Sequence, residues 1–539
     1  MPSNAHMQLL DRILQSINTG RMHGSGGPRG HFDAPSDAQA HAHAQTQTQT
    51  PTQTPPQPEG CFCEPPPGLH PSERKPKTRL QFHIPMFVWN WPVLRAVPRL
   101  LTHMLGPFVL PFMSAGVVVW ARRLTKRLIG DAPATAANVV HEAYVPSSAS
   151  GSFLGLVALA GACVAMAMLI FRDEVMWRSF GRGTNHVQPG FYYSNTPRNN
   201  RIAAGVDEHY NPTWWLFTGT HATLYPFLTY TIEEVRYKRM WVWNPVDGEK
   251  VGLDIAFPSD KGFQPDRPVL LVLHGLNGGS KELYCMDLVK RACAQGYTCV
   301  VMIARGLMQT PLTSANLFNG TRTSDLRATI VALKDVLPSD TKMVGCGFSM
   351  GAIILNNYLT RCGDDAGLEA AVSLSGGFDS VKNSLYDASR KVWQPFLVYA
   401  LKKNFITENL DHPGFQEIDL HRAHRARDVI EFDTALSAPL AGFPTLEDYY
   451  REMSGNYDDR MDQIRIPLLA LHAVDDPIVD VDSIPLAHTA TNANLFFLVT
   501  MNGGHVGWPT GVRPNQSQFG FMSNVVLSFC HSALTCAHG

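Results

Sequence analysis

Short apolar runs alternate with longer amphipathic stretches from about residue 211 to the end of the chain. The runs have the length of β-strands and occupy residues 269–273, 298–303, 342–345, 370–374, 467–471 and 495–499. Between most of them, apolar residues recur at helical spacing, as in residues 281–295 and 324–337. Strands that alternate with helices predict an α/β domain with a mostly parallel, doubly wound sheet covered on both faces.

One long segment, residues 377–464, interrupts this alternation. It is more charged than its surroundings and rich in aromatic and basic residues. An insertion of this size, late in a doubly wound domain, predicts a helical cap over the strand ends, where ligands bind in such folds. We therefore assign residues 210–539 to one domain, with the cap at about residues 377–464.

The first 80 residues have a different pattern. Residues 45–58 repeat Gln, Thr and Pro, and apolar side chains are nearly absent from this tract. Such a composition has too little apolar surface to offset the entropy lost on ordering. Residues 1–80 are therefore predicted to be a disordered, low-complexity tail.

Two apolar runs separate the tail from the α/β domain. Residues 152–171 contain no charged side chain, and at about 1.5 Å per residue a helix of this length crosses the hydrocarbon core of a bilayer. They predict a transmembrane helix, followed by a linker at residues 172–209. Residues 106–120 are shorter and contain two prolines, which predicts an interfacial segment within a membrane-proximal region at residues 81–151.

These runs predict a single-pass membrane protein, with the endoplasmic reticulum or another endomembrane as the working assignment. Arg172, Arg178 and Arg182 follow residues 152–171 closely, and the rule that places positive charges in the cytosol then favours a cytosolic C-terminal side. The count changes if residues 106–120 also insert, so the topology stays open.

Charge and cysteine content exclude several classes of protein. The chain has 45 Lys and Arg against 46 Asp and Glu, a net charge of -1, whereas nucleic-acid binders normally carry a basic excess. Ten cysteines in 539 residues are too few for a disulfide scaffold. Cys61 and Cys63 are not followed nearby by a second Cys or His pair, so we expect no metal site and no cofactor.

The most informative motif is the pentapeptide Gly-Phe-Ser-Met-Gly at residues 347–351. It follows a predicted strand and precedes an apolar helical stretch, which is the context of a nucleophile elbow. The elbow holds its serine in a strained turn, and the flanking glycines avoid clashes with the neighbouring strand and helix. Ser349 is therefore the candidate nucleophile.

A serine nucleophile needs a general base and an acid that orients the base. Two later strands are each followed by a suitable residue, Asp476 after residues 467–471 and His505 after residues 495–499. Both lie just past a strand end, at the edge of the sheet that also carries the elbow. Asp475 is the adjacent alternative, and we choose Asp476 because it precedes the Pro-Ile-Val that leads into the next element.

An oxyanion hole is expected beside the serine. The strand at residues 269–273 runs into His-Gly-Leu-Asn-Gly-Gly, a turn that can direct the backbone N–H of Leu276 at a substrate oxygen. Met350, which follows the nucleophile, supplies the second N–H. The turn has neither the Lys-Ser/Thr of a P-loop nor a GxGxxG run, so phosphate binding is disfavoured.

Together these motifs resemble the α/β-hydrolase superfamily, and within it AB hydrolase family 4. This family includes the embryogenesis-associated proteins, α/β-hydrolase domain-containing proteins one and three, and the yeast medium-chain ester synthase/esterases. Further pieces resemble the family as well: Tyr210 to Trp214, the turn at Asp247-Gly248, Arg305-Gly306, the segment from Gly320 to Leu326, and Glu431-Phe432-Asp433 in the cap. The resemblance also suggests that Thr323 caps a helix.

The resemblance implies a membrane-anchored serine hydrolase that cleaves monoacylglycerols, phospholipids or short- to medium-chain esters. Two alternatives stay open. The same residues can transfer the acyl group to an alcohol instead of water, or the domain can be a catalytically inactive membrane scaffold. The expected partners are a membrane and a lipid or other acyl-ester substrate, and no nucleic acid.

Overall fold

The computed structural model describes residues 187–258, 262–314, 316–406 and 420–536. The predicted tail, the interfacial segment at residues 106–120 and the transmembrane helix at residues 152–171 lie outside the described residues.

A nine-stranded sheet forms the centre of the described domain, in the order β1-β9-β8-β7-β6-β4-β5-β3-β2. The strands β4 to β9 run parallel to one another, whereas β1 pairs antiparallel with β9, β3 pairs antiparallel with β5, and β2 pairs antiparallel with β3. Their bounds are Gly190–Tyr193 (β1), Lys238–Trp243 (β2), Lys250–Ala256 (β3), Val269–Leu273 (β4), Thr298–Ile303 (β5), Met343–Phe348 (β6), Ala370–Leu374 (β7), Leu468–Ala473 (β8) and Leu495–Thr500 (β9). The mostly parallel sheet predicted from the sequence is confirmed.

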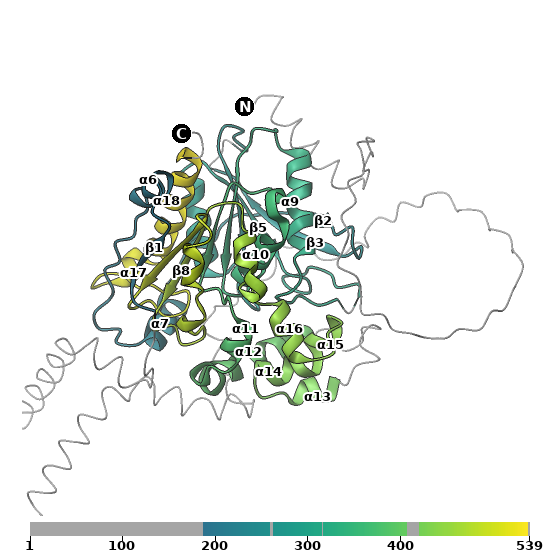
Figure 1. Cartoon of the computed structure of the whole chain (residues 1–539). Helices are drawn as coiled ribbons and strands as arrows, with labels where there is room; N and C mark the ends of the chain where they lie inside the picture. Colours follow the sequence, from purple (N-terminus) through teal and green to yellow (C-terminus); the bar gives the residue numbers. More distant parts are fainter. Residues whose placement is uncertain (1–186, 259–261, 315, 407–419, 537–539) are drawn as a thin grey trace, which may run out of the picture. The chain divides into compact units, whose positions relative to one another are not determined.

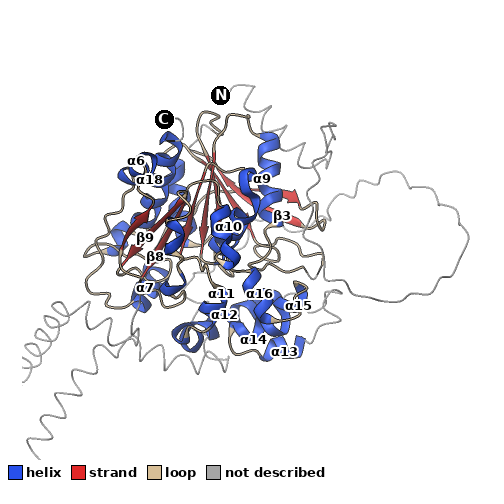
Figure 2. Cartoon of the chain, in the orientation of Figure 1, coloured by secondary structure: helices blue, strands red, loops and turns tan. Residues whose placement is uncertain are grey.

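Helices cover both faces of the sheet (Figure 2). Outside the insertion between β7 and β8 they are Pro197–Ala204 (α6), Gly219–Thr229 (α7), Leu283–Ala294 (α8), Ser324–Val336 (α9), Met350–Cys362 (α10), Pro514–Ser517 (α17) and Gly520–Cys536 (α18). The segment 172–209, which the sequence suggested as a linker, contributes β1 and α6, and β1 extends the sheet beside β9.

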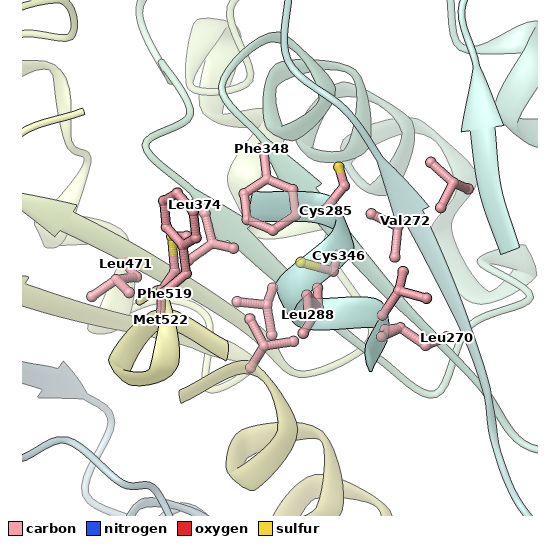
Figure 3. Close-up of a cluster of buried hydrophobic side chains, with 14 of the residues drawn as sticks. Leu270, Val272, Cys285, Leu288, Cys346, Phe348, Leu374, Leu471, Phe519 and Met522 are labelled. Carbon is pink, nitrogen blue, oxygen red and sulfur yellow. The ribbon is translucent and has the colours of Figure 1, made fainter. Parts of the chain in front are cut away.

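The side chains of each central strand alternate between two core layers, because successive residues of a strand face opposite sides. In β4, Leu270 and Val272 pack with residues of α8 and α18, whereas Leu271 and Leu273 pack with residues of α9 and α10. Figure 3 shows the first layer, where Cys285 and Leu288 of α8 and Met522 of α18 lie with side chains from β4, β6, β7 and β8. Burial on both faces explains why the strands read as continuous apolar runs.

The C-terminal helical segment Pro514–Cys536 is, among the described residues, the one long and apolar enough to cross a membrane. Most of it is buried within the domain. Phe521, Val525 and Phe529 of α18 belong to the core layer that includes α8. Its apolar composition is therefore accounted for by packing in the core, and it gives only weak evidence for a membrane.

The insertion between β7 and β8 is helical. Its α-helices are Ser380–Ser384 (α11), Gln394–Leu401 (α12), Leu420–Arg425 (α13), Val429–Phe432 (α14), Ala438–Leu440 (α15) and Leu446–Glu452 (α16). They lie together at the lower end of the sheet in Figure 1. Tyr386 Oη donates to the carbonyl oxygen of Asp476 at 3.1 Å, and Asn357 Nδ2 of α10 donates to the carbonyl oxygen of Met453 at 2.9 Å. The insertion is thus bonded to the loop that follows β8 and to helix α10.

A buried ion network holds the loop that follows β5. The side chain of Arg305 is fully buried and pairs with Asp247 in the β2–β3 turn and with Asp325 in the first turn of α9. A buried guanidinium with two carboxylates satisfies most of its donors, which offsets the cost of removing it from water. Thr323 stands at the N-cap position of α9, but its side chain makes no capping hydrogen bond, unlike the expectation from the sequence.

Candidate active site

Ser349 lies in a strained turn between β6 and α10. Its backbone has φ 51° and ψ -114°, a conformation that is costly for a residue with a side chain. The turn requires the two glycines of the motif. A Cβ atom at Gly347 would lie 2.6 Å from the Cα of Ala352, and one at Gly351 would lie 2.4 Å from the carbonyl oxygen of Leu273. The local sequence therefore forces the serine to the carboxyl edge of the sheet.

Three predicted site residues are hydrogen-bonded in a row. His505 Nε2 lies 2.9 Å from Ser349 Oγ, and His505 Nδ1 lies 2.9 Å from Asp476 Oδ2. Because a carboxylate accepts only, Nδ1 carries the ring proton, and Nε2 is left to accept from the serine hydroxyl. Asp476 follows β8 and His505 follows β9, so the parallel strands bring both residues to the same edge as Ser349.

The Asp476 carboxylate is held in its charged form although it is buried. Burial raises the pKa of Asp476. Attraction to His505, the hydrogen bond to that ring and two backbone N–H donors lower it by more than burial raises it, so the net shift is downward. The two backbone donors are those of Ile478 and Val479, at 2.8 and 2.9 Å from Oδ1. The tight turn after β8 thus fixes both the charge and the orientation of this side chain.

Asp475, the neighbouring acid, makes different contacts. Its Oδ1 accepts from the backbone N–H of Gly504 at 2.8 Å, and its Oδ2 lies 3.5 Å from Asn502 Nδ2. These bonds hold the loop that carries His505, whereas the imidazole itself is bonded to Asp476.

The turn after β4 lies against the serine. A Cβ atom at Gly275 would be 3.4 Å from the Cβ of Ser349. The carbonyl oxygen of Gly275 accepts from His274 Nδ1 at 2.8 Å and from the N–H of Gly278 at 3.1 Å. Since the peptide group is planar and trans, the N–H of Leu276 points away from those two donors. The second candidate donor, the N–H of Met350, occupies the first position of α10, where no acceptor exists within the helix.

Two supporting residues were given no role in the site from the sequence. Tyr284 Oη accepts from the N–H of Gly275 at 3.0 Å, and Thr223 Oγ1 in α7 accepts from the N–H of His505 at 2.8 Å. Each fixes the backbone of a loop rather than a reacting group. No local pattern reveals these contacts, because the one to Thr223 joins residues that are 282 positions apart.

Burial strongly affects two histidines near the site. It lowers the pKa of His274 to about 4 and that of His472 to about 4, from 6.5 for both. Between pH 6.5 and 4 the unfolded chain therefore binds more protons at these positions than the folded chain, and stability falls as the pH falls. Asp433 has the opposite effect, because burial raises its pKa to about 6 and folding takes up a proton there.

His472→Gln is expected to flatten the acid side of the stability profile. Removing one such histidine reduces the pH dependence of the free energy of unfolding by up to about 1.4 kcal/mol per pH unit between pH 6.5 and 4. The measurement is chemical unfolding of the detergent-solubilised chain at pH 4.5, 5.5, 6.5 and 7.5, with His531→Gln on the exposed part of α18 as control. If the free energy of unfolding of His472→Gln and of the wild type changed with pH in the same way, the argument that burial lowers the pKa of His472 would be contradicted.

No group of three or more His, Cys, Asp or Glu side chains in the described part of the chain is arranged to hold a metal ion.

Known proteins share this domain. The family model described as serine aminopeptidase, S33, matches residues 264–503. Mouse (Mus musculus) phospholipase ABHD3 is 30% identical over 344 residues, which are 62% of this chain and 80% of that protein. A monoacylglycerol lipase of Saccharomyces cerevisiae is 34% identical over 261 residues, 47% of this chain and 57% of the lipase. A solved structure of the Pyrococcus furiosus esterase Pf2001 is similar at 17% identity, with 55% of this chain and 97% of the esterase covered and a TM-score of 0.33.

The parallel sheet with a serine in a strained turn at its carboxyl edge defines an α/β hydrolase, and the matching family model agrees. The chain belongs to AB hydrolase family 4 of this superfamily, together with ABHD3, the yeast monoacylglycerol lipase and the embryogenesis-associated protein EMB8 of Picea glauca. It is an enzyme of the ester hydrolase class.

Proposed function

We propose that the protein is a membrane-anchored serine hydrolase that cleaves acyl esters of lipids through a Ser349–His505–Asp476 triad. The observation that carries this proposal is the continuous hydrogen bonding from Ser349 Oγ through the imidazole to the Asp476 carboxylate, with distances of 2.9 Å on both sides of the ring. This arrangement activates a hydroxyl that is otherwise a poor nucleophile.

In the proposed reaction, Ser349 Oγ attacks the ester carbonyl while His505 Nε2 takes its proton. The imidazolium formed is stabilised by Asp476, and His505 then gives the proton to the departing alcohol. The N–H groups of Leu276 and Met350 stabilise the negative oxygen of the tetrahedral intermediate. Water, activated by the same histidine, releases the acid from the acyl-enzyme.

A lipid substrate is supported by the relatives and by the predicted topology. Relatives are named phospholipase, monoacylglycerol lipase and medium-chain fatty acid ethyl ester synthase/esterase. The predicted membrane helix at residues 152–171 would hold the domain where such esters are found. We propose that the helical insertion within residues 377–464 acts as the cap that selects the acyl chain, in keeping with its bonds to loops around Ser349 and Asp476.

The ester synthase/esterase among the relatives supports a second candidate, transfer of the acyl group to an alcohol. The full chain in detergent would be given a monoacylglycerol, a phosphatidylcholine and a p-nitrophenyl ester, with and without ethanol, and the products followed by mass spectrometry. We expect fatty acid as the main product in each case, because bulk water is the more abundant acceptor. A dominant ethyl ester would favour the acyltransferase, and no product from any ester would favour the inactive scaffold.

A further inference from the structure

Exposed and half-buried aromatic and aliphatic side chains lie on segments close to the candidate active site. They come from the loop before α7, from the end of α7 and from the loop before α17, and we call them the aromatic rim: Trp214, Trp215, Tyr225, Phe227, Leu228 and Val512. Trp214, Phe227, Leu228 and Val512 are 42, 53, 62 and 66% exposed. Large apolar side chains of a folded domain are normally removed from water, so a cluster of this kind marks an interaction surface.

Contacts join three members of the rim, Trp215, Tyr225 and Val512. The rings of Trp215 and Tyr225 meet edge to face with centroids 5.1 Å apart. Trp215 Nε1 donates to the carbonyl oxygen of Val512 at 3.0 Å, and Tyr225 Oη donates to Asn515 Oδ1 at 2.6 Å. Because the polar tips of both rings are bonded within the domain, the rim presents mainly carbon to its surroundings.

The rim lies at the catalytic end of the domain. Thr223, which holds the backbone of His505, belongs to the same helix as Phe227 and Leu228. At a rise of 1.5 Å per residue, the Cα atoms of Phe227 and Leu228 lie roughly 6–8 Å from that of Thr223 along the axis of α7. In Figure 1, α7 lies at the same end of the sheet as the helical insertion.

The chain also enters the domain at this end. The first residue of β1, Gly190, pairs with Val499 near the carboxyl end of β9, and His505 follows that strand. Residues 172–186 separate the predicted membrane helix from the first described residue, Val187. Fifteen residues reach at most about 50 Å. The described chain therefore begins on the side that carries the candidate site, within that distance of the predicted anchor.

We propose that the aromatic rim docks on the phospholipid bilayer that holds residues 152–171 and turns the candidate active site toward the membrane surface. The proposal rests on the membrane-anchored function proposed above. Tryptophan and tyrosine favour the interface between lipid and water, and Phe227 and Leu228 gain free energy by entering the acyl region. A tether that arrives at the same end favours the bilayer over a second copy of the chain as the partner.

The first test compares two substrates in one preparation. The full chain is reconstituted in phosphatidylcholine vesicles that contain a long-chain monoacylglycerol, and a water-soluble p-nitrophenyl butyrate is added separately. Phe227→Ser/Leu228→Ser is expected to lower turnover of the vesicle-borne ester roughly tenfold or more and to leave butyrate hydrolysis unchanged. Val246→Ser/Val331→Ser, at residues that are 75 and 43% exposed outside the rim, is the matched control.

An equal loss of turnover on both substrates would mean that the rim supports the stability of the domain. No loss of turnover on either substrate would mean that the rim does not help the enzyme to reach lipid. Either result would overturn the proposal. A wild type without ester hydrolysis would instead defeat the proposed function, so docking is also measured without catalysis.

The second test uses the Ser349→Ala chain in vesicles that contain brominated phosphatidylcholine, which quenches nearby tryptophan fluorescence. We expect Trp214→Tyr in this background to reduce the quenched fraction of the emission. Equal quenched fractions with and without Trp214 would overturn docking. A rim variant that converts dimers to monomers in sedimentation, with quenching unchanged, would assign the surface to a second copy and overturn it as well.

Discussion

Ser349→Ala is expected to abolish labelling by a fluorophosphonate probe and to lower ester hydrolysis by about six orders of magnitude. The hydroxyl oxygen of Ser349 lies 2.9 Å from His505 Nε2, and alanine leaves this base with no group to activate. The fold should tolerate the change, because the backbone N–H of Ser349 donates to the carbonyl oxygen of Leu374 and the positive φ belongs to the turn rather than to the hydroxyl. Labelling is measured on the detergent-solubilised full chain.

The matched control is Ser384→Ala in α11, a serine whose hydroxyl donates to the carbonyl oxygen of Val381. It should label like the wild type. Labelling that persists in Ser349→Ala would show that another residue is the nucleophile. An unlabelled wild type that is otherwise folded would remove both the hydrolase and the acyltransferase proposals and leave the scaffold.

Asp476→Asn is expected to lower turnover by about four orders of magnitude while the domain stays folded. The asparagine carbonyl can keep accepting from Ile478 and Val479, which now bond to Oδ1. Its amide N–H, however, would face His505 Nδ1 and favour the tautomer with the proton on Nε2. That ring cannot accept the proton of Ser349. Turnover of p-nitrophenyl butyrate and the midpoint of thermal unfolding are measured together.

Asp475→Asn provides the comparison, because the two acids are adjacent and have the same side chain. The carbonyl of an asparagine there can still accept from the N–H of Gly504, as Oδ1 of Asp475 does. We expect less than a tenfold loss from Asp475→Asn, since the imidazole contacts Asp476. A large loss from Asp475→Asn together with a small loss from Asp476→Asn would exchange the roles assigned to the two acids.

Several parts of the fold followed directly from the sequence pattern. The strands β4, β5 and β7 have the predicted bounds, residues 269–273, 298–303 and 370–374, because strands buried on both faces read as short apolar runs between turns. The strand β1 was missed. It is four residues long and half-buried at the edge of the sheet, so neither its length nor its burial pattern gave it a distinct signature.

Short local motifs also predicted part of the candidate site. Flanking glycines indicated the strained turn at Ser349, and the positions just past two strands suggested Asp476 and His505 as its partners. The choice of Asp476 over Asp475 rested on a few flanking residues. The contacts that distinguish the two acids run to different parts of the loop that carries His505, and no pattern in the sequence encodes them.

The sequence by itself determined the order of strands and helices along the chain. It also determined which chemical groups the site contains and which strand each of them follows. These features depend on side-chain periodicity and on turn residues, which act over a few positions. Only the tertiary structure decided which groups meet: Ser349 and His505 are 156 positions apart and lie 2.9 Å from each other. It also decided that Trp215 contacts Tyr225 and the backbone of Val512, which lies 297 positions away. Such contacts arise from packing between distant segments, and the local pattern of hydrophobic and polar residues carries no record of them.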